Sequence, residues 1–353
     1  MAEKSYFDQR NIENTRKLRE IRRDLPPLCN EFFVGIETRT SVLTRLAYAY
    51  DLRIFFYYLF TETSTFASYE AATFDFNALA KVTTSDIETF MEYLSYYKFD
   101  GKEYVNTEKT KARKLASVKS FFKYFYNKDK LPADPASKVL TPKIHDKPII
   151  RLDSDEVSQL LDEVESGANL PSARQESFHE KTKVRDVAII TLFLGTGIRI
   201  SELVGLNVSD LDFNINGFKV TRKGGNQSIL YFSQEVADAL KAYLNERSLD
   251  PSLDDEPALF LSLQKKRMSV RSVEKLVKKY AKLITPLKHI TPHKLRSTYG
   301  TELYRETGDI YVVAEVLGHR DINTTKKHYA AISDDIKRSA AQKVTLRDKK
   351  KKD

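Results

Sequence analysis

Residues 194–203 read LGTGIRISEL, and this stretch decides how the second half of the chain folds. A Gly-Thr-Gly break interrupts one helical pattern, and a new helical stretch begins beside Arg199. From that position a guanidinium can reach an anion near a helix N-terminus, where backbone N–H groups also favour negative charge. Taken alone, Arg199 could equally be a structural ion-pair partner of Glu202. We expect Glu202 to support the helix that bears Arg199.

The segments on either side of this stretch predict a helix and a small sheet. Residues 184–194 carry apolar side chains at helical spacing and are followed by Gly195, a typical helix-ending residue. The expected buried face consists of Val187, Ile190, Thr191 and Leu194. Further along, residues 218–222 and 228–232 are short strand candidates on either side of Lys223-Gly224-Gly225-Asn226. Glycine and asparagine at those positions are typical of a hairpin turn.

A second motif, TPHKLRSTYGT at residues 291–301, combines a histidine and an arginine. Pro292 is suited to the first position of a helix, where its missing N–H costs nothing. His293 and Arg296 are three residues apart, so on that helix both would face one side.

A third motif, LGHRDINTT at residues 317–325, follows the apolar run VVAEVL. We expect Gly318 to end the helix of that run and to present His319 at its end. Downstream, Asn323 or Thr324 can cap a short helix that carries Tyr329. Taken alone, His319 could be an ordinary polar residue near a helix end, and Tyr329 is one of 19 tyrosines.

Together these motifs resemble the tyrosine recombinase family, also called the phage integrase family. That family's motifs run in the order G-x-R-x-S-E-L, a lysine in a hairpin, H-x-x-R, G-H and a tyrosine, and residues 150–335 follow this order. The resemblance implies a mainly α fold with a small β-sheet, in which a helical core-binding domain precedes a mixed α/β catalytic domain. It maps the family's active site onto Arg199, Lys223, His293, Arg296, His319 and Tyr329.

The resemblance also implies the chemistry: Tyr329 attacks a phosphodiester and forms a 3′-phosphotyrosyl bond, without a metal ion or any other cofactor. Ten positions separate His319 from Tyr329, one more than the spacing typical of the family, and His328 directly precedes Tyr329. Tyr329 is nevertheless the only tyrosine between LGHR and the tail, so we expect it to be the nucleophile. Tyr304 and Tyr311 are the alternatives.

The residue types suit this reaction. Arg199 and Arg296 stay charged at any working pH, and their planar forks hold phosphate oxygens at two points. A phenol has a pKa of about 10 and needs help to lose its proton. His293 is the candidate base, with His319 as a phosphate-binding or orienting donor. Lys223 is the candidate acid that protonates the leaving 5′ oxygen, as the resemblance suggests.

The first part of the chain predicts three helices. One covers 38–60, where Leu43, Leu46, Ala47, Tyr50 and Ile54 follow helical spacing. Another covers about 84–97, with Thr84 or Ser85 as its cap. The last covers about 107–127 and alternates apolar residues with basic ones. Its candidate DNA contacts are Lys109, Lys111, Arg113 and Lys119, although a basic helix face is more often plain solvated surface.

Four prolines between residues 131 and 150 block helix continuation and predict an extended connection between domains. We expect the helical core-binding domain over 1–140, a linker over 141–150 and the catalytic domain over 151–335. The tail, 336–353, would dock on a neighbouring subunit if it follows the family, or be plain disordered charge.

The composition favours a polyanionic partner, with 58 basic against 49 acidic residues and a net charge of +9. Residues 264–282 form the best basic helix candidate of the second half, with Lys265, Lys266, Arg267 and Arg271 expected at DNA. No apolar run approaches the length of a membrane span, and the N-terminus lacks the pattern of a signal peptide, so we expect a cytoplasmic protein. The lone Cys29 excludes an internal disulfide.

The resemblance implies a homotetramer on two copies of a specific double-stranded DNA site, and two other classes of protein remain as alternatives. A DNA-binding protein could keep the fold without catalysis, and a type IB topoisomerase uses a similar set of residues to relax supercoils. Within the recombinases, the chain could resolve chromosome dimers for chromosome partition at cell division, as Xer proteins do, or integrate a mobile element. Its length, similar to that of single-recombinase Xer proteins, favours the Xer role.

Overall fold

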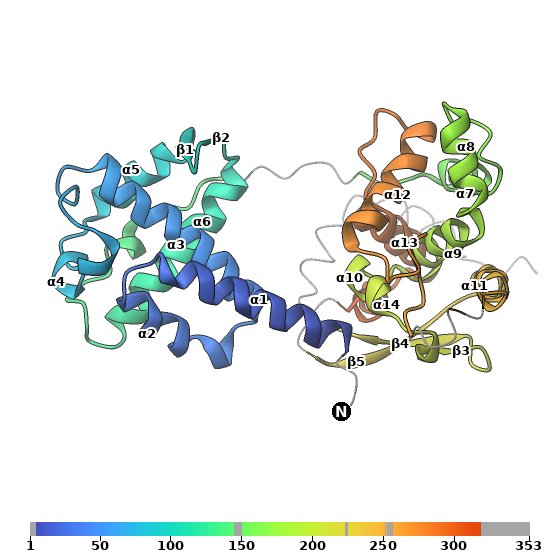
Figure 1. The fold of residues 1–353 in the computed structure, drawn as a ribbon, viewed down its shortest axis with the longest axis horizontal. Helices are drawn as coiled ribbons and strands as arrows, with labels where there is room; N and C mark the ends of the chain where they lie inside the picture. The colour runs from blue at the N-terminus through green and yellow to red at the C-terminus, as the bar shows by residue number, and fades with distance from the viewer. Residues whose placement is uncertain (1–4, 145–149, 223–224, 251, 253–256, 319–353) are drawn as a thin grey trace, which may run out of the picture. The chain divides into compact units, whose positions relative to one another are not determined.

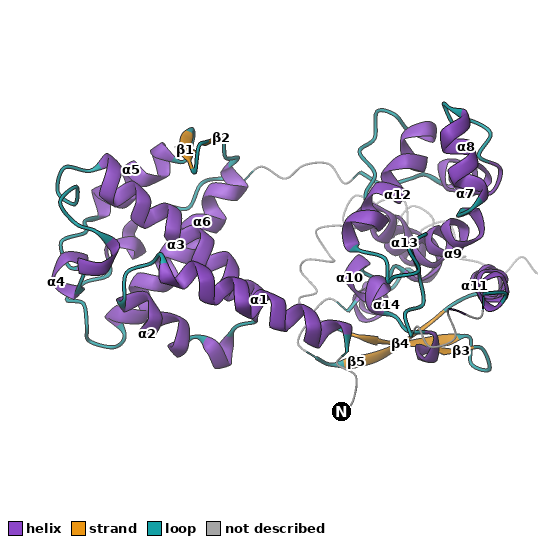
Figure 2. Cartoon of the chain, viewed as in Figure 1, coloured by secondary structure: helices purple, strands orange, loops and turns teal. Residues whose placement is uncertain are grey.

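The computed structural model describes residues 5–144, 150–222, 225–250, 252 and 257–318. The chain divides into two compact units, Met1–Lys147 and Pro148–Asp353. Figure 1 labels their helices and strands, and Figure 2 shows that helices dominate both units. None of the helices in these ranges is both long and apolar enough to cross a membrane.

The first unit is a helical bundle with one small hairpin. Its elements are α1 Tyr6–Arg23, α2 Leu28–Gly35, η1 Glu37–Arg39, α3 Val42–Glu62, η2 Ala71–Thr73, α4 Phe76–Leu79, α5 Thr84–Tyr93, β1 Tyr97–Phe99, β2 Lys102–Tyr104, α6 Glu108–Tyr126 and η3 Pro135–Lys138. Helix α3 packs against α1 and α6, which places it at the centre of the core.

The buried face of α3 differs from the predicted one. Leu43 and Tyr50 are 44% and 47% exposed, whereas Leu52, Phe55 and Phe56 are buried. Because α3 contacts helices on more than one side, its buried arc is wide and is set by aromatic side chains. Phe56, for example, makes edge-to-face contacts with Phe74 and Phe121. The helix itself was predicted correctly, and Leu46 and Ile54 of the predicted face are buried, but Leu43 and Tyr50 were wrongly assigned to it.

The other two predicted helices of this unit are present with shifted ends. Helix α5 is capped by Thr83 rather than by Thr84 or Ser85, because Thr83 and Asp86 form a reciprocal capping box. It ends at Tyr93, and Tyr97 already belongs to β1. Helix α6, predicted over about 107–127, begins at Glu108 after its cap Thr107. The first half of the proline-rich connection is not extended, since Pro135–Lys138 forms a 3₁₀ turn that packs on the core.

A buried carboxylate ties α3 to α6. Asp51 is fully buried and accepts hydrogen bonds from the Arg113 guanidinium, from Ser117 Oγ at 2.7 Å and from Lys114 Nζ at 3.3 Å. Burial lowers the pKa of Lys114, and the charge of Asp51 opposes that shift. The carboxylate therefore compensates the buried charge of Lys114 and also pairs with the half-exposed Arg113.

We predict that Asp51→Ala destabilises the protein by about 3–5 kcal/mol, because Lys114 would keep a buried charge without its partner. Chemical denaturation followed by circular dichroism measures the change. The control is Glu31→Ala, which removes the half-exposed ion pair with Lys130 and should cost at most about 1 kcal/mol. Equal effects of the two changes would contradict the compensating role of Asp51.

The second unit surrounds a central helix with further helices and a three-stranded sheet. Its elements are α7 Ser154–Ser166, α8 Ala173–Glu180, α9 Lys183–Thr196, α10 Ile200–Gly205, η4 Val208–Asp210, β3 Leu211–Asp212, β4 Gly217–Thr221, β5 Gln227–Tyr231, α11 Gln234–Ser248, α12 Val270–Ile284, α13 Pro292–Thr307 and α14 Ile310–Leu317. The strands are antiparallel in the order β3-β4-β5. A mainly α fold with a small β-sheet was predicted, and it is confirmed, whereas the two-stranded sheet of the first unit was not predicted.

Helix α9 packs against α7, α11 and α13 and is buried on nearly all sides, not on one face as predicted. It continues past Gly195 and ends at Gly197, which adopts the left-handed conformation with φ 61°. Gly195 serves close packing instead, since a Cβ there would lie 2.4 Å from Cγ2 of Val236. The break before Arg199 is therefore made by Gly197.

The predicted basic helix of residues 264–282 begins later, at Val270. Ser269 caps α12 by accepting a hydrogen bond from the backbone of Ser272. Before the cap, Leu261 and Arg267 form an antiparallel bridge, and Lys265 adopts a positive φ of 57°. The basic composition of the segment did not indicate where the helix starts.

Candidate active site

Arg199 lies at the junction between α9 and α10, as the N-cap of α10. The buried carboxylate of Glu202 accepts a hydrogen bond from the Arg199 backbone N–H at 3.0 Å and from Nη1 at 2.9 Å. Nη2 donates to the carbonyl oxygen of Gly318 at 2.9 Å. Glu202 thus supports the start of α10, as expected. Although its guanidinium is paired, the Arg199 side chain as a whole remains 31% exposed.

Arg296 projects from α13, which begins at Pro292 as predicted. Its side chain is buried and donates hydrogen bonds to the carbonyl oxygens of Gly197 and Leu317. His293 lies in the first turn of the same helix and is exposed. Gly197 leaves room for Tyr299 of the same helix, because a Cβ there would lie 2.5 Å from Cδ1 of Tyr299.

The C-terminal end of α14 is the point at which the arginines meet. Gly318 ends α14 in the left-handed conformation, as predicted. The last carbonyl groups of a helix lack partners inside it and carry partial negative charge, which favours cations. Three side chains supply these cations, and we call them the three-arginine cluster: Arg199, Arg222 and Arg296, which together contact the carbonyl oxygens of Val316, Leu317 and Gly318.

Arg222 was not identified from the sequence. It directly follows β4. Burial lowers the pKa of Arg222, the negative charge of Glu202 opposes this shift, and the positive charge of Arg199 lowers the pKa further. A guanidinium nevertheless stays charged at any working pH. In the sequence, only its position next to Lys223 indicated a role for Arg222, because its partners on α14 are more than 90 positions away.

The remaining three catalytic candidates, Lys223, His319 and Tyr329, lie outside the described residues. Two of them are adjacent in the sequence to residues of this site. Lys223 directly follows Arg222, and His319 directly follows Gly318. The β4–β5 hairpin that was predicted around Lys223 is present, with Phe218 opposite Leu230 and Val220 opposite Ser228.

The four DNA-binding candidates of α6 differ in whether their charged groups bind other groups of the protein. Lys109 is exposed, whereas the other three make contacts within the protein. These contacts are Lys111 Nζ with Ser95 Oγ at 2.8 Å, Arg113 with Asp51, and Lys119 Nζ with the carbonyl oxygen of Val139 at 2.7 Å. Arg113 keeps half of its side chain exposed beside the ion pair.

The candidates before and within α12 divide in the same way. Lys266 and Arg271 are exposed. Lys265 pairs with Asp250 at 2.6 Å. Arg267 binds the end of α10. Its guanidinium donates hydrogen bonds to the carbonyl oxygens of Val204 and Leu206 and to Asn207 Oδ1.

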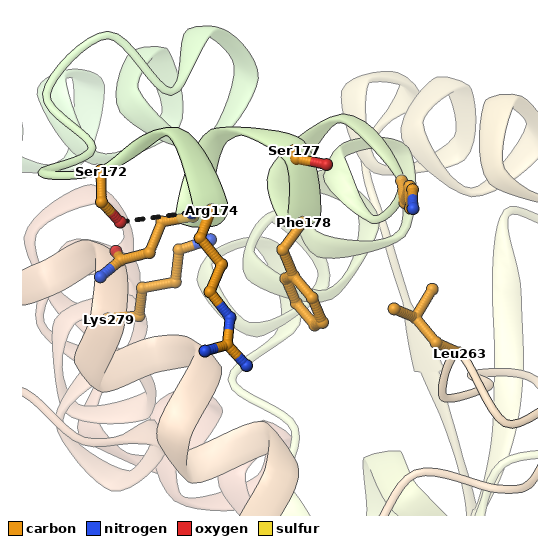
Figure 3. A pocket seen from close by; sticks show the side chains of 8 residues that line it. Ser172, Arg174, Ser177, Phe178, Leu263 and Lys279 are labelled. Carbon is orange, nitrogen blue, oxygen red and sulfur yellow. Dashed lines mark hydrogen bonds between the residues drawn. The ribbon is translucent and has the colours of Figure 1, made fainter.

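A pocket lies between α8 and α12, where Arg174, Phe178 and Lys279 project into it (Figure 3). Its lining contains none of the predicted catalytic residues, so it is separate from the three-arginine cluster. In the part of the chain that the structure describes, no three His, Cys, Asp or Glu side chains gather as ligands for one metal ion.

Comparisons with known proteins identify the family of the chain. Residues 150–335 match the model of the phage integrase family. Tyrosine recombinase XerC of Caldanaerobacter subterraneus subsp. tengcongensis is 32% identical over 333 residues, or 91% of this chain and 87% of the relative. XerC of Thermodesulfovibrio yellowstonii is 35% identical over 74% of this chain and 84% of the relative.

Solved structures share the fold. The Tn1549 transposon integrase in complex with circular intermediate DNA gives a TM-score of 0.62 at 22% identity, covering 90% of this chain and 99% of that one. The XerH recombinase bound to its difH substrate gives 0.61 at 20% identity, covering 86% of this chain and 80% of that one. By its sequence relatives and its fold, the chain belongs to the phage integrase family and is a site-specific tyrosine recombinase.

Proposed function

We propose that the chain cleaves and rejoins double-stranded DNA at a specific site through Tyr329, with a 3′-phosphotyrosyl intermediate and no cofactor. One observation carries this proposal: Arg199 and Arg296 converge on the end of α14 directly before His319, and the Arg199 side chain remains 31% exposed. Cations held in fixed positions stabilise the charge that builds on the non-bridging oxygens during attack on a phosphodiester.

The protein and the DNA supply every atom and proton that the proposed reaction needs. The phenolic oxygen of Tyr329 attacks phosphorus and its proton passes to His293, while the bond from phosphorus to the 5′ oxygen breaks. Lys223 donates the proton that the leaving 5′ oxygen requires. Because the phosphotyrosyl bond keeps the energy of the broken linkage, a 5′-hydroxyl from another strand can attack it and restore DNA without ATP.

DNA binding would rest mainly on phosphate contacts, to which the exposed Lys109, Lys266 and Arg271 are suited. Strand exchange between two sites requires four nucleophiles, so we propose a homotetramer on two sites, acting in the cytoplasm. The relatives named XerC favour a role in chromosome dimer resolution over integration of a mobile element.

A two-step experiment tests this function. DNA that stays covalently attached to the protein in cells is isolated and sequenced, which identifies the site. Two direct copies of that site are then placed in one plasmid and incubated with purified protein. Resolution into two circles is expected. Relaxation of supercoils without exchange would indicate a topoisomerase instead, and binding without any cleavage would indicate a DNA-binding protein.

A further inference from the structure

Arg222 connects two parts of the site that are far apart in the sequence. We propose that Arg222 is a positioning residue for the proposed reaction: it fixes the end of β4 to the end of α14, and proton transfer by Lys223, the next residue in the chain, depends on this anchor. This inference rests on the proposed function, because it assumes that Lys223 is the acid that protonates the 5′ oxygen.

On its own hairpin, Arg222 makes two contacts. Its backbone N–H donates to the carbonyl oxygen of Asn226 at 2.7 Å. Its side chain crosses to the opposite strand, where Nε donates to Ser228 Oγ at 2.8 Å. The guanidinium is therefore held in a fixed orientation relative to the strands that lead into and out of the turn.

Away from the hairpin, the same guanidinium contacts α14 and Glu202. Nη2 donates to the carbonyl oxygen of Val316 at 2.9 Å, and Nη1 lies 3.4 Å from that of Leu317. Nη1 also lies 3.7 Å from the carboxylate of Glu202. The Leu317 carbonyl also accepts from Arg296, and Glu202 also accepts from Arg199. Arg222 thus shares one acceptor with each of the proposed catalytic arginines.

Gly318 makes this close approach possible. A Cβ at that position would lie 2.9 Å from the guanidinium carbon of Arg222, which is too near for any ordinary contact. Gly318 also has a φ of 59°, where other residues are strained. The glycine of the G-H motif therefore both ends α14 and leaves space for Arg222.

These contacts require the planar fork of arginine. Three nitrogens point at acceptors on β5, on α14 and on Glu202, while only 12% of the side chain is exposed. A lysine ammonium has one nitrogen and cannot reach all of these acceptors at once. We therefore expect Arg222→Lys to behave like Arg222→Ala, although it keeps the charge.

The test compares two DNA substrates that differ in one atom, the bridging 5′ oxygen or a sulfur in its place. A thiol is a much stronger acid than an alcohol, so the sulfur leaves without a proton donor. Single-turnover cleavage by Arg222→Ala should slow on the order of 10²-fold with the oxygen substrate. With the sulfur substrate it should return close to the wild-type rate, which would also show that the variant is folded.

Two comparison variants make the outcome decisive. Arg305→Ala removes an exposed arginine paired with Glu302 on the same unit and should leave both rates unchanged. Lys223→Ala should be slow with oxygen and restored with sulfur. If sulfur fails to restore Lys223→Ala, then Lys223 is not the acid and the proposed proton path is wrong.

If instead sulfur restores Lys223→Ala but not Arg222→Ala, the proposed function stands and the positioning role is overturned. Arg222 would then support the phosphate-binding arginines. Wild-type rates for Arg222→Lys or Arg222→Ala with the oxygen substrate would likewise overturn the proposal, because the fork would not be needed.

Discussion

Tyr329→Phe is expected to bind the recombination site as tightly as the wild type and to form no covalent DNA adduct. The change removes one oxygen atom, which is the proposed nucleophile, and leaves an aromatic ring of nearly the same size. Loss of a nucleophile lowers the rate of the chemical step by many orders of magnitude, on the order of 10⁶-fold in a well-studied hydrolase. Denaturing gels with end-labelled DNA measure the adduct, and gel shifts measure binding.

Tyr311→Phe is the matched control. Tyr311 is 65% exposed on α14 and was one of the two alternative nucleophiles. Its variant should form adduct at the wild-type rate. Adduct from Tyr329→Phe together with none from Tyr311→Phe would transfer the role of nucleophile to Tyr311.

Arg199→Ala is expected to lower cleavage by at least about 10²–10³-fold, the usual effect of removing one group that stabilises transition-state charge. Site binding should stay largely intact, because many phosphate contacts share the affinity. Arg296→Ala should also abolish cleavage. It also leaves the carbonyl of Gly197 without this donor, so about 1–3 kcal/mol of stability should be lost as well.

The two arginine variants are measured by single-turnover cleavage and by gel shift at one fixed salt concentration. Arg271→Ala provides the opposite case, since Arg271 is exposed on α12 and is proposed to contact phosphates. Its variant should bind more weakly and cleave normally once DNA is saturating. Loss of binding in step with cleavage for Arg199→Ala would show that Arg199 is structural.

Features with a local cause could be predicted from the sequence. Pro292 begins α13 and Gly318 ends α14, because proline and glycine impose these backbone conformations directly. The β4–β5 hairpin followed from its turn residues in the same way. The expected support of α10 by Glu202 is local too, as Arg199 and Glu202 are three positions apart.

Features that depend on tertiary packing could not be predicted. The buried face of α3 is set by the helices around it, and Gly195 is explained by its contact with Val236. The start of α12 was placed too early, because basic residues before Ser269 do not distinguish a loop from a helix. Arg222 could not be identified from the sequence, because its partners Val316 and Leu317 lie close to it only in the folded protein.

Identification of the amino acid that carries the DNA would settle the nucleophile without any substitution. Trapped adduct is digested with nuclease and trypsin, and the nucleotide-bearing peptide is sequenced by mass spectrometry. The three candidate tyrosines fall on different tryptic peptides, since Arg305 and Arg320 separate Tyr304, Tyr311 and Tyr329. We predict the nucleotide on HYAAISDDIK, residues 328–337, at Tyr329. A nucleotide on a peptide with Tyr304 or Tyr311, or on His328, would contradict the proposed chemistry.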